Sequence, residues 1–185
     1  MKSKNINKIL IVDFGSQVTQ LIARQVRELG VYCELINFKK FNKFKTFDKN
    51  IKGIILSGGP KSTLSKSAPN IKWKLFLNKL PLLGICYGHQ LISNICGGKT
   101  KYSNKKEFGS AILIEKKKSK LTEGFFTNKK NTVWMSHSDS VMIKPKNFNV
   151  IASSKNSKFA ILENKRKKIF TTQFHPEVFH TNNGK

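Results

Sequence analysis

Short apolar segments and segments with helical spacing alternate along the first half of the chain. Four continuous apolar runs predict strands, at residues 8–14, 31–38, 51–57 and 80–86. Two further stretches place apolar side chains at near-helical spacing and predict helices, at residues 17–30 and 69–80. Uniformly apolar strands that alternate with helices are typical of a parallel sheet covered on both faces.

The second half of the chain, after Gly98, contains shorter strand candidates separated by Lys, Asn, Ser and Gly. These candidates lie at residues 107–117, 132–136, 140–143, 149–153, 159–164 and 168–174. Such a pattern favours antiparallel pairing. Because no repeat or long linker divides the chain, we expect a single α/β domain over residues 1–185. Its central sheet should be mainly parallel but mixed, flanked by helices, with the antiparallel strands in the C-terminal half.

The composition fits a folded protein without membrane spans. The 185 residues are 38% hydrophobic and include 14 phenylalanines, which argues against disorder. No apolar run approaches the ~20 residues of a membrane helix, and the basic residues 1–10 lack the features of a signal peptide. We therefore expect a soluble, cytoplasmic protein with no membrane partner. The polar residues 181–185 resemble the start of a linker, which suggests a domain of a longer polypeptide.

The net charge of +25 comes from 35 lysines and arginines against 10 acidic residues. Such a balance can mark a nucleic-acid binder. However, only Arg24, Arg27 and Arg166 supply the bidentate guanidinium that phosphate and guanine recognition favours, and the lysines are spread along the chain. A solvated surface is the favoured interpretation, with weak, salt-sensitive binding of RNA or DNA and no specific nucleic-acid partner. A basic nucleic-acid-binding module is the alternative.

The chain has three cysteines, Cys33, Cys86 and Cys96. Their odd number argues against a disulfide framework. A CxxC pair and a cysteine–histidine spacing typical of metal ligands are both missing, so we expect neither a zinc site nor another cofactor in this domain. Cys96 has no flanking motif and is interpreted as a buried, inert thiol.

Cys86 lies in the sequence Gly-Ile-Cys-Tyr-Gly, residues 84–88, with a glycine two places away on each side. This spacing is typical of a nucleophile elbow, a tight strand-to-helix turn whose strained central residue tolerates only small neighbours. The turn should hold the sulfur out into solvent at a helix N-terminus, where unpaired N–H groups favour thiolate over thiol. The alternative is a cysteine packed at a sheet end beside permissive glycines.

A thiol nucleophile needs a base, and His175 is the best placed of the four histidines because it follows an apolar strand candidate. Pro176 keeps the local chain extended, and residues two apart in an extended chain point to the same side. Glu177 is therefore expected to approach the imidazole of His175 and to orient it. Alone, this His-Pro-Glu segment would be interpreted as an ordinary loop.

The Ser-Gly-Gly-Pro segment at 57–60 directly follows an apolar strand candidate. A Gly-Gly turn exposes backbone N–H groups that can stabilise a developing oxyanion, and the N–H of Tyr87, next to the nucleophile, is the natural second donor. A phosphate-binding loop is disfavoured because neither GxGxxG nor GxxxxGK[ST] occurs. A plain Gly-Gly turn remains the alternative.

Three segments, SGGP (57–60), GICYGHQLI (84–92) and QFHPEV (173–178), together resemble the signature blocks of class I, triad-type glutamine amidotransferase domains. Within that family, four flanking segments are similar to amidotransferase domains of the GMP synthetase type: residues 9–35, 107–109, 133–141 and 175–184. The family fold is flavodoxin-like, and the resemblance implies a core of about residues 8–180. Ser138 departs from the pattern, which has glycine at that position.

The resemblance implies hydrolysis of the side-chain amide of L-glutamine. Cys86 would be the nucleophile, His175 the general acid and base, and Glu177 the residue that orients His175. Gly59 and Tyr87 would provide the oxyanion donors. The positions implied to bind glutamine are Gly58, Gln90, Ser136, His137 and Ser138.

The resemblance also implies a partner, because ammonia in such enzymes passes to a synthetase domain, an ATP pyrophosphatase that aminates XMP to GMP with ATP and Mg²⁺. That domain and the C-terminal dimerisation domain are expected to be absent from residues 1–185, since no SGGxDS-type loop occurs. Two alternatives keep the fold: an amidotransferase component serving another acceptor synthase, and a stand-alone cysteine peptidase or γ-glutamyl hydrolase.

Overall fold

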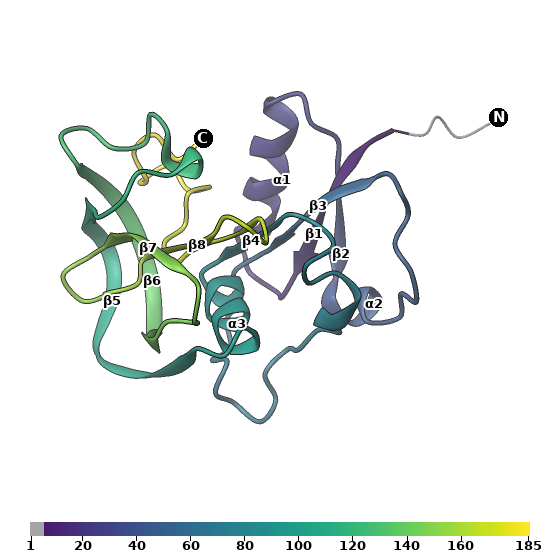
Figure 1. The fold of residues 1–185 in the computed structure, drawn as a ribbon, viewed down its shortest axis with the longest axis horizontal. Helices are drawn as coiled ribbons and strands as arrows, with labels where there is room; N and C mark the ends of the chain where they lie inside the picture. The colour runs from purple at the N-terminus through teal and green to yellow at the C-terminus, as the bar shows by residue number, and fades with distance from the viewer. Residues whose placement is uncertain (1–5) are drawn as a thin grey trace.

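A nine-stranded sheet runs through the computed structural model, which describes residues 6–185 apart from the side chain of Leu75 (Figure 1). The strands are β1 Lys8–Asp13, β2 Cys33–Asn37, β3 Ile51–Leu56, β4 Leu82–Ile85, β5 Lys99–Glu115, β6 Lys130–Ile143, β7 Asn149–Ser153, β8 Ile161–Asn164 and β9 Ile169–Thr172. Their order is β2-β1-β3-β4-β9-β8-β7-β5-β6. The first five strands in that order are parallel, and all later pairs are antiparallel. The predicted mixed α/β sheet is confirmed.

Helices cover the two faces of the parallel half. Helix α1 (Thr19–Glu28) lies on one face, and α2 (Phe38–Phe41) and α3 (Tyr87–Ile95) lie on the other (Figure 1). Two 3₁₀ turns complete the described elements, η1 (Trp73–Leu75) and η2 (Lys120–Thr122). None of the described helices is long and apolar enough to cross a membrane. The basic residues 1–5, part of the segment from which we expect no signal peptide, lie outside the described residues.

Strand alternation distributes the apolar side chains between the two faces. In β1, Ile11 packs with Ile22 and Ala23 of α1, whereas Leu10 and Val12 join the cluster on the opposite face. A third buried cluster, which includes Leu113 and Met135, fills the antiparallel half. The continuous apolar runs of β1, β3 and β4 thus reflect strands that are buried on both sides.

The predicted helix at 69–80 is wrong, because only η1 forms there. The backbone of this segment is held by a side chain from another part of the chain. The Asn42 side chain accepts a hydrogen bond from Lys72 N (2.9 Å) and donates one to Asn70 O (2.8 Å). Asn78 has a φ of 68°, a left-handed conformation that a helix cannot contain. Burial of Phe76 in the core is therefore achieved by an irregular segment.

The two short strands predicted at 132–136 and 140–143 form one strand, β6. Its polar centre was expected to separate them, but Asp139 pairs with Tyr102 of β5 and His137 pairs with Glu107. The ladder is irregular between Tyr102 and Glu107, which lets the long β5 follow β6.

Cys96 also differs from expectation. It caps the C-terminus of α3 and is only half-buried, although burial raises the pKa of its thiol.

Helix α3 approaches the sheet at Gly88. A methyl group at Gly88 would lie 2.3 Å from Leu56 O, and one at Gly84 would lie 2.6 Å from Gly88 O. Both distances are far below van der Waals contact with rigid backbone. The two glycines that flank Cys86 therefore allow α3 to start directly against β3 and β4.

We predict that Gly88→Ala lowers the free energy of unfolding by about 1–3 kcal/mol, because the added methyl must displace the β3 backbone. Urea unfolding followed by circular dichroism would measure the loss. Gly53→Ala in β3 is the matched control, since its methyl would meet the flexible end of Ile9 at 3.1 Å. An equal loss in both variants would contradict the packing argument.

Candidate active site

Cys86 occupies the corner between β4 and α3 in a strained conformation, with φ 51° and ψ −99°. Such a positive φ is uncommon for a residue other than glycine and is typical of a nucleophile elbow. Its N–H donates to Thr172 O at the end of β9 (2.8 Å), which ties the corner to the neighbouring strand. The elbow geometry agrees with the glycine spacing of the sequence.

The expectation that the elbow holds the sulfur out into solvent is wrong, because Cys86 is only 6% exposed. Strand β6 covers it: the Cys86 Sγ lies 3.6 Å from Ser136 O. On another side Gln173 Nε2 lies 3.9 Å from Sγ. Residues distant in sequence bury the corner, so local spacing could not reveal this.

His175 and Glu177 follow β9, the strand next to β4. The His175 Nδ1 lies 2.8 Å from Glu177 Oε1, and both side chains are buried. The backbone of His175 is held on both sides, since its N–H donates to Trp134 O (3.0 Å) and its carbonyl accepts from Thr181 Oγ1 (2.6 Å). The imidazole is therefore fixed in position with its Nδ1 toward the carboxylate.

The electrostatics favour a protonated His175. Burial alone would lower the pKa of His175, but hydrogen bonds with Cys86 and Glu177, together with their negative charges, outweigh burial and raise the pKa to about 10. The arrangement holds an imidazolium between the sulfur of Cys86 and the carboxylate of Glu177.

The two glycines of the 57–60 turn have different neighbours. A methyl at Gly58 would lie 2.9 Å from His175 Cε1, so Gly58 lies against the imidazole ring. Gly59 packs between Phe14 and Tyr87. Within residues 6–185, no protein group accepts a hydrogen bond from the backbone N–H of Gly59 or of Tyr87. These two N–H groups can therefore receive an external oxyanion.

The Tyr87 side chain is directed away from this chemistry. Its hydroxyl donates to Pro69 O, and burial raises the pKa of the phenol to about 12. Tyr87 therefore remains neutral, and only its backbone is available to a ligand.

A pocket of about 220 Å³ opens beside Cys86. It is lined by Gly59, Pro60, Lys61, Ser62, Cys86, Tyr87, Gln90, Phe108, Ser136, His137, Ser138 and Asp139. The lining includes the nucleophile candidate, both oxyanion candidates and most of the residues implied to bind glutamine. Gly58 is the exception, because it contacts His175 and does not line the pocket.

Comparison with known proteins decides the family. The model of the glutamine amidotransferase class-I family matches residues 10–185. The chain belongs to this class I glutamine amidotransferase family. It is 48% identical over 180 residues to the GMP synthase [glutamine-hydrolyzing] of Agrobacterium fabrum and 47% identical over 181 residues to that of Brachyspira hyodysenteriae. These alignments cover 96% and 97% of this chain but 34% of each relative, so the chain spans about a third of their length.

A solved structure supports the same grouping. A Thermoplasma acidophilum protein, described as a candidate component of a GMP synthase, shares 31% identity and superimposes with a TM-score of 0.79. The superposition covers 97% of this amidotransferase chain and 88% of that protein. The flavodoxin-like amidotransferase architecture is thereby confirmed.

The β6 residues of the Cys86 pocket are held by a buried polar network. Both His137 nitrogens face acceptors, Nδ1 toward Asp139 O (2.9 Å) and Nε2 toward Glu107 Oε2 (3.1 Å). Ser154 and Ser157 also donate to Glu107. Burial would raise the pKa of Glu107, but these hydrogen bonds and His137 lower it below its usual value. Both ring nitrogens of His137 therefore already have partners within the protein. Only its backbone and the surface of its ring are available to a ligand.

Ser138 causes no backbone strain, because it lies within β6 and is not among the described residues with positive φ. Gln90 is buried, and its Nε2 donates to Asp139 O (2.9 Å) and to Gln173 Oε1 (3.3 Å). The sequence arguments missed Gln173 and Glu107 as site residues. The signal for Gln173 was available, since it belongs to the predicted strand at 168–174 and lies two residues before His175.

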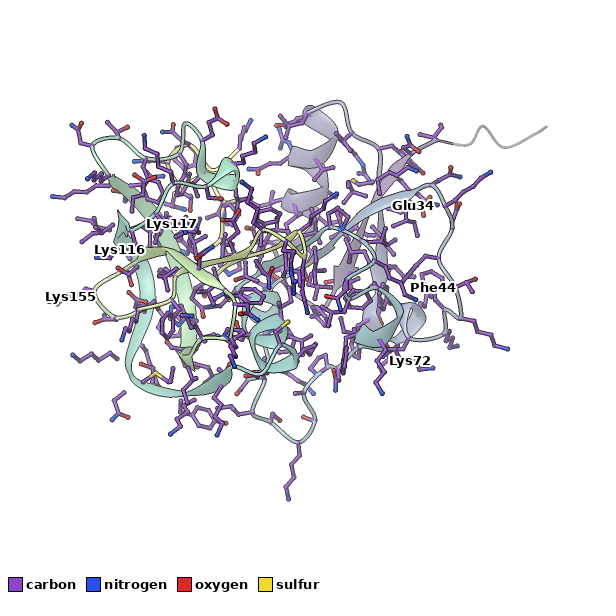
Figure 2. The ribbon with its side chains drawn as sticks, in the orientation of Figure 1. Glu34, Phe44, Lys72, Lys116, Lys117 and Lys155 are labelled. Atoms are coloured by element: carbon purple, nitrogen blue, oxygen red, sulfur yellow. The ribbon has the colours of Figure 1, made fainter. Side chains whose placement is uncertain are left out.

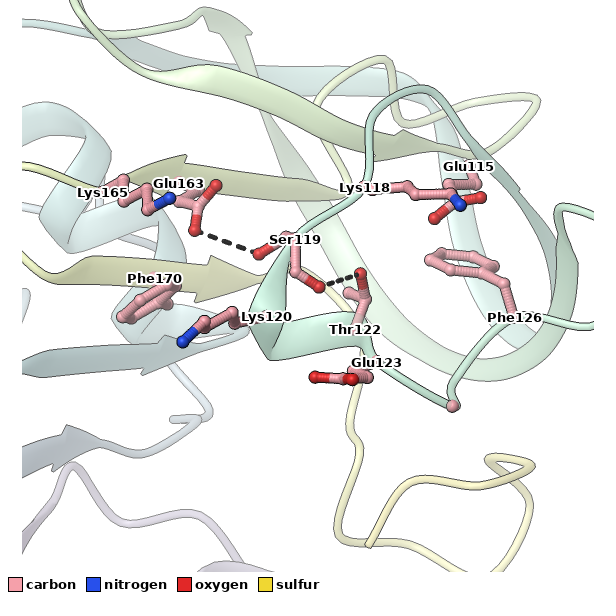
Figure 3. A pocket seen from close by; sticks show the side chains of 11 residues that line it. Glu115, Lys118, Ser119, Lys120, Thr122, Glu123, Phe126, Glu163, Lys165 and Phe170 are labelled. Atoms are coloured by element: carbon pink, nitrogen blue, oxygen red, sulfur yellow. Dashed lines mark hydrogen bonds between the residues drawn. The ribbon is translucent and has the colours of Figure 1, made fainter.

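A second cavity, of about 680 Å³, lies over β8 and β9 and shares no lining residue with the Cys86 pocket (Figure 3). Its lining combines Lys118, Lys120 and Lys165 with Glu163, whose Oε1 accepts from Ser119 Oγ (3.0 Å). It contains no cysteine or histidine. Within residues 6–185, no group of three potential metal-ligating side chains could hold an ion.

Among the lysines of residues 6–185, those that form ion pairs are Lys8 and Lys185. Four of the acidic residues are buried: Glu107, Asp139, Glu163 and Glu177. Three more, Glu28, Glu34 and Asp48, already form ion pairs with basic side chains. Side chains such as Lys116, Lys117 and Lys155 extend outward from the antiparallel half (Figure 2). The weak, salt-sensitive nucleic-acid binding expected from the sequence stays a prediction.

We predict that protonation of His175 makes stability pH-dependent. Its folded-state pKa of about 10 exceeds the ordinary value of 6.5, so the contribution is fully present below about pH 6.5 and is lost as the pH rises toward 10. Free energies of unfolding measured by urea titration across this range should fall more steeply for the wild type than for His175→Gln. Parallel declines would contradict the assignment.

Proposed function

We propose that this chain is the glutaminase component of a GMP synthase, which hydrolyses the side-chain amide of L-glutamine and supplies ammonia for amination of XMP. The observation that carries the proposal is the strained Cys86, placed between the buried His175–Glu177 pair and a pocket with two free backbone N–H groups. Family membership supports an amide of the glutamine type as the substrate.

The reaction begins with attack of the Cys86 thiolate on the amide carbon of glutamine. The oxyanion that forms accepts hydrogen bonds from the N–H groups of Gly59 and Tyr87. His175, protonated at the start, gives its proton to the amide nitrogen, and ammonia leaves as the γ-glutamyl thioester forms.

Water then attacks the thioester, and His175 takes its proton. Collapse of the second intermediate releases glutamate and restores the thiolate and the imidazolium. Glu177 keeps its hydrogen bond to His175 throughout, which stabilises the imidazolium state and fixes the ring. The overall reaction consumes glutamine and water and produces glutamate and ammonia.

The remainder of the substrate lies along β6 and α3 in this proposal. Ser136, His137 and Ser138 offer backbone and hydroxyl groups to the amino acid portion, and Gln90 offers its Oε1, since its Nε2 is already engaged. Gly58 acts indirectly, because its lack of a side chain makes room for His175.

The partner is a synthetase domain, an ATP pyrophosphatase supplied in cis or in trans. The curated relatives named GMP synthase are about three times as long as this chain, since it spans 34% of them. The domain boundary, the use of ATP and Mg²⁺ by the partner, dimerisation through a C-terminal domain and a cytoplasmic location belong to the same proposal. This chain itself uses no cofactor in the reaction described.

Labelling with a glutamine-mimicking electrophile, such as a diazo-ketone analogue, tests the nucleophile. We expect modification at Cys86, protection by glutamine, and loss of glutaminase activity by at least about 10³-fold in Cys86→Ala. Cys33→Ala and Cys96→Ala are matched controls and should retain activity. Peptide mapping that places the label on Cys33 or Cys96 would overturn the mechanism.

A coupled assay tests the acceptor. The isolated chain should release ammonia slowly, and a GMP synthetase domain with ATP and XMP should increase the rate. Equal rates with and without that domain would exclude coupling to XMP amination and favour another acceptor synthase. Faster turnover of γ-glutamyl peptides than of glutamine would favour a stand-alone hydrolase.

A further inference from the structure

Three buried polar groups form a hydrogen-bonded chain that ends at the sulfur of Cys86. The carbonyl of Asp139 accepts from Gln90 Nε2 (2.9 Å), and the same Nε2 donates to Gln173 Oε1 (3.3 Å). The other end of that amide, Gln173 Nε2, lies 3.9 Å from Cys86 Sγ. The chain thus links the β6 backbone to the nucleophile through two glutamine side chains.

The orientation of each amide in this chain follows from the first acceptor. A backbone carbonyl can only accept, so Gln90 must present its NH₂ group to Asp139. The remaining hydrogen of that NH₂ then points to Gln173, which must accept it through its side-chain carbonyl oxygen. Consequently the NH₂ of Gln173 is directed at the sulfur, and the opposite amide orientation would break two hydrogen bonds.

Gln173 has no freedom to act elsewhere. It is 1% exposed, and its backbone N–H donates to Ala160 O (2.8 Å) on the segment that leads into β8. It lies two residues before His175, between the end of β9 and the imidazole. Burial strengthens a hydrogen bond from an amide to an anion, because water does not compete for either group.

The two protonation states of the sulfur have different partners. A thiol can donate to Ser136 O, which lies 3.6 Å away, whereas a thiolate requires a donor. Within residues 6–185, the side chains that can donate to Sγ are His175 and the amide of Gln173. The site therefore contains a specific neutral donor for the ionised state.

We propose that Gln173 stabilises the Cys86 thiolate by donating a hydrogen bond from its side-chain amide, with its orientation set by Gln90 and the backbone of Asp139. The inference rests on the proposed function in that Cys86 is the nucleophile. Unlike the imidazolium, a neutral amide keeps its donor hydrogens when His175 gives its proton to the departing amide nitrogen. Gln173 can therefore also stabilise the sulfur as a leaving group when the thioester is hydrolysed.

The pH dependence of Cys86 labelling measures the effect of the Gln173 donor, provided that the other titratable groups around the sulfur are unchanged. Those that face the pocket or lie behind it are Lys61, Tyr87, His89, His137, Asp139, His175 and Glu177. Burial lowers the pKa of His89 to about 3, so it stays neutral in the relevant range. None of these residues is altered in the variants below.

The test compares wild type with Gln173→Met, which keeps the length of the side chain but has no donor. Iodoacetamide labelling of Cys86 is measured by peptide mapping from acid to alkaline pH. We expect half-maximal labelling to move up by about one pH unit and labelling near neutral pH to fall about tenfold, the effect of one hydrogen bond to a charged group. Gln20→Met, an exposed change on α1, is the matched control and should match wild type.

An unchanged labelling profile in folded Gln173→Met would overturn the role of Gln173 while leaving the proposed function intact. Labelling confined to Cys33 or Cys96 in wild type would instead reject Cys86 as the nucleophile. If Gln173→Met does not fold, a measurement on the wild-type protein still tests the role of Gln173. The side-chain amide resonances of Gln173 in ¹⁵N spectra must shift with the pH profile of Cys86 labelling, and resonances that stay constant would overturn the proposal.

Discussion

The strained corner at Cys86 is the constraint on which the site depends. Its φ of 51° is maintained because α3 starts in direct contact with the sheet, and that contact is closed by Gly88 against Leu56 and by Gly84 against Gly88. Strain of this kind costs of order 1–3 kcal/mol and persists only where the surroundings over-determine the backbone. Packing of two glycines thus sets the position of a sulfur atom.

Strand order then brings the other groups to that corner. Strands β4 and β9 are adjacent and parallel, so the residues that follow them, Cys86 and His175, emerge at the same edge of the sheet. Strand β6 belongs to the antiparallel half, yet it folds back over the corner and contributes Ser136 to the wall of the pocket. The mixed sheet therefore shapes the candidate site, since the parallel half carries Cys86 and His175 and the antiparallel half encloses them.

Enclosure changes the electrostatics of the reactive groups. A sulfur in solvent would be stabilised as an anion by water, whereas the buried Cys86 depends on protein donors. His175 lies between Cys86 and Glu177, and interactions with both groups raise its pKa to about 10 although burial alone would lower it. The amides of Gln173 and Gln90 continue the same network toward β6. Segments that lie 50 and 87 positions from Cys86 in the chain thus surround its sulfur with hydrogen-bonding groups.

Local sequence determined the elements and the reactive corner, because strand runs, the Gly-x-Cys-x-Gly spacing and the His-Pro-Glu segment act through neighbouring residues. The helix expected at 69–80 failed because contacts with Asn42 and the aromatic core override local spacing. Burial of Cys86, the long β6 and the roles of Glu107 and Gln173 depend on residues 30 to 87 positions apart in the chain. Only tertiary packing decides such contacts, since no periodic pattern records which buried polar group will meet another.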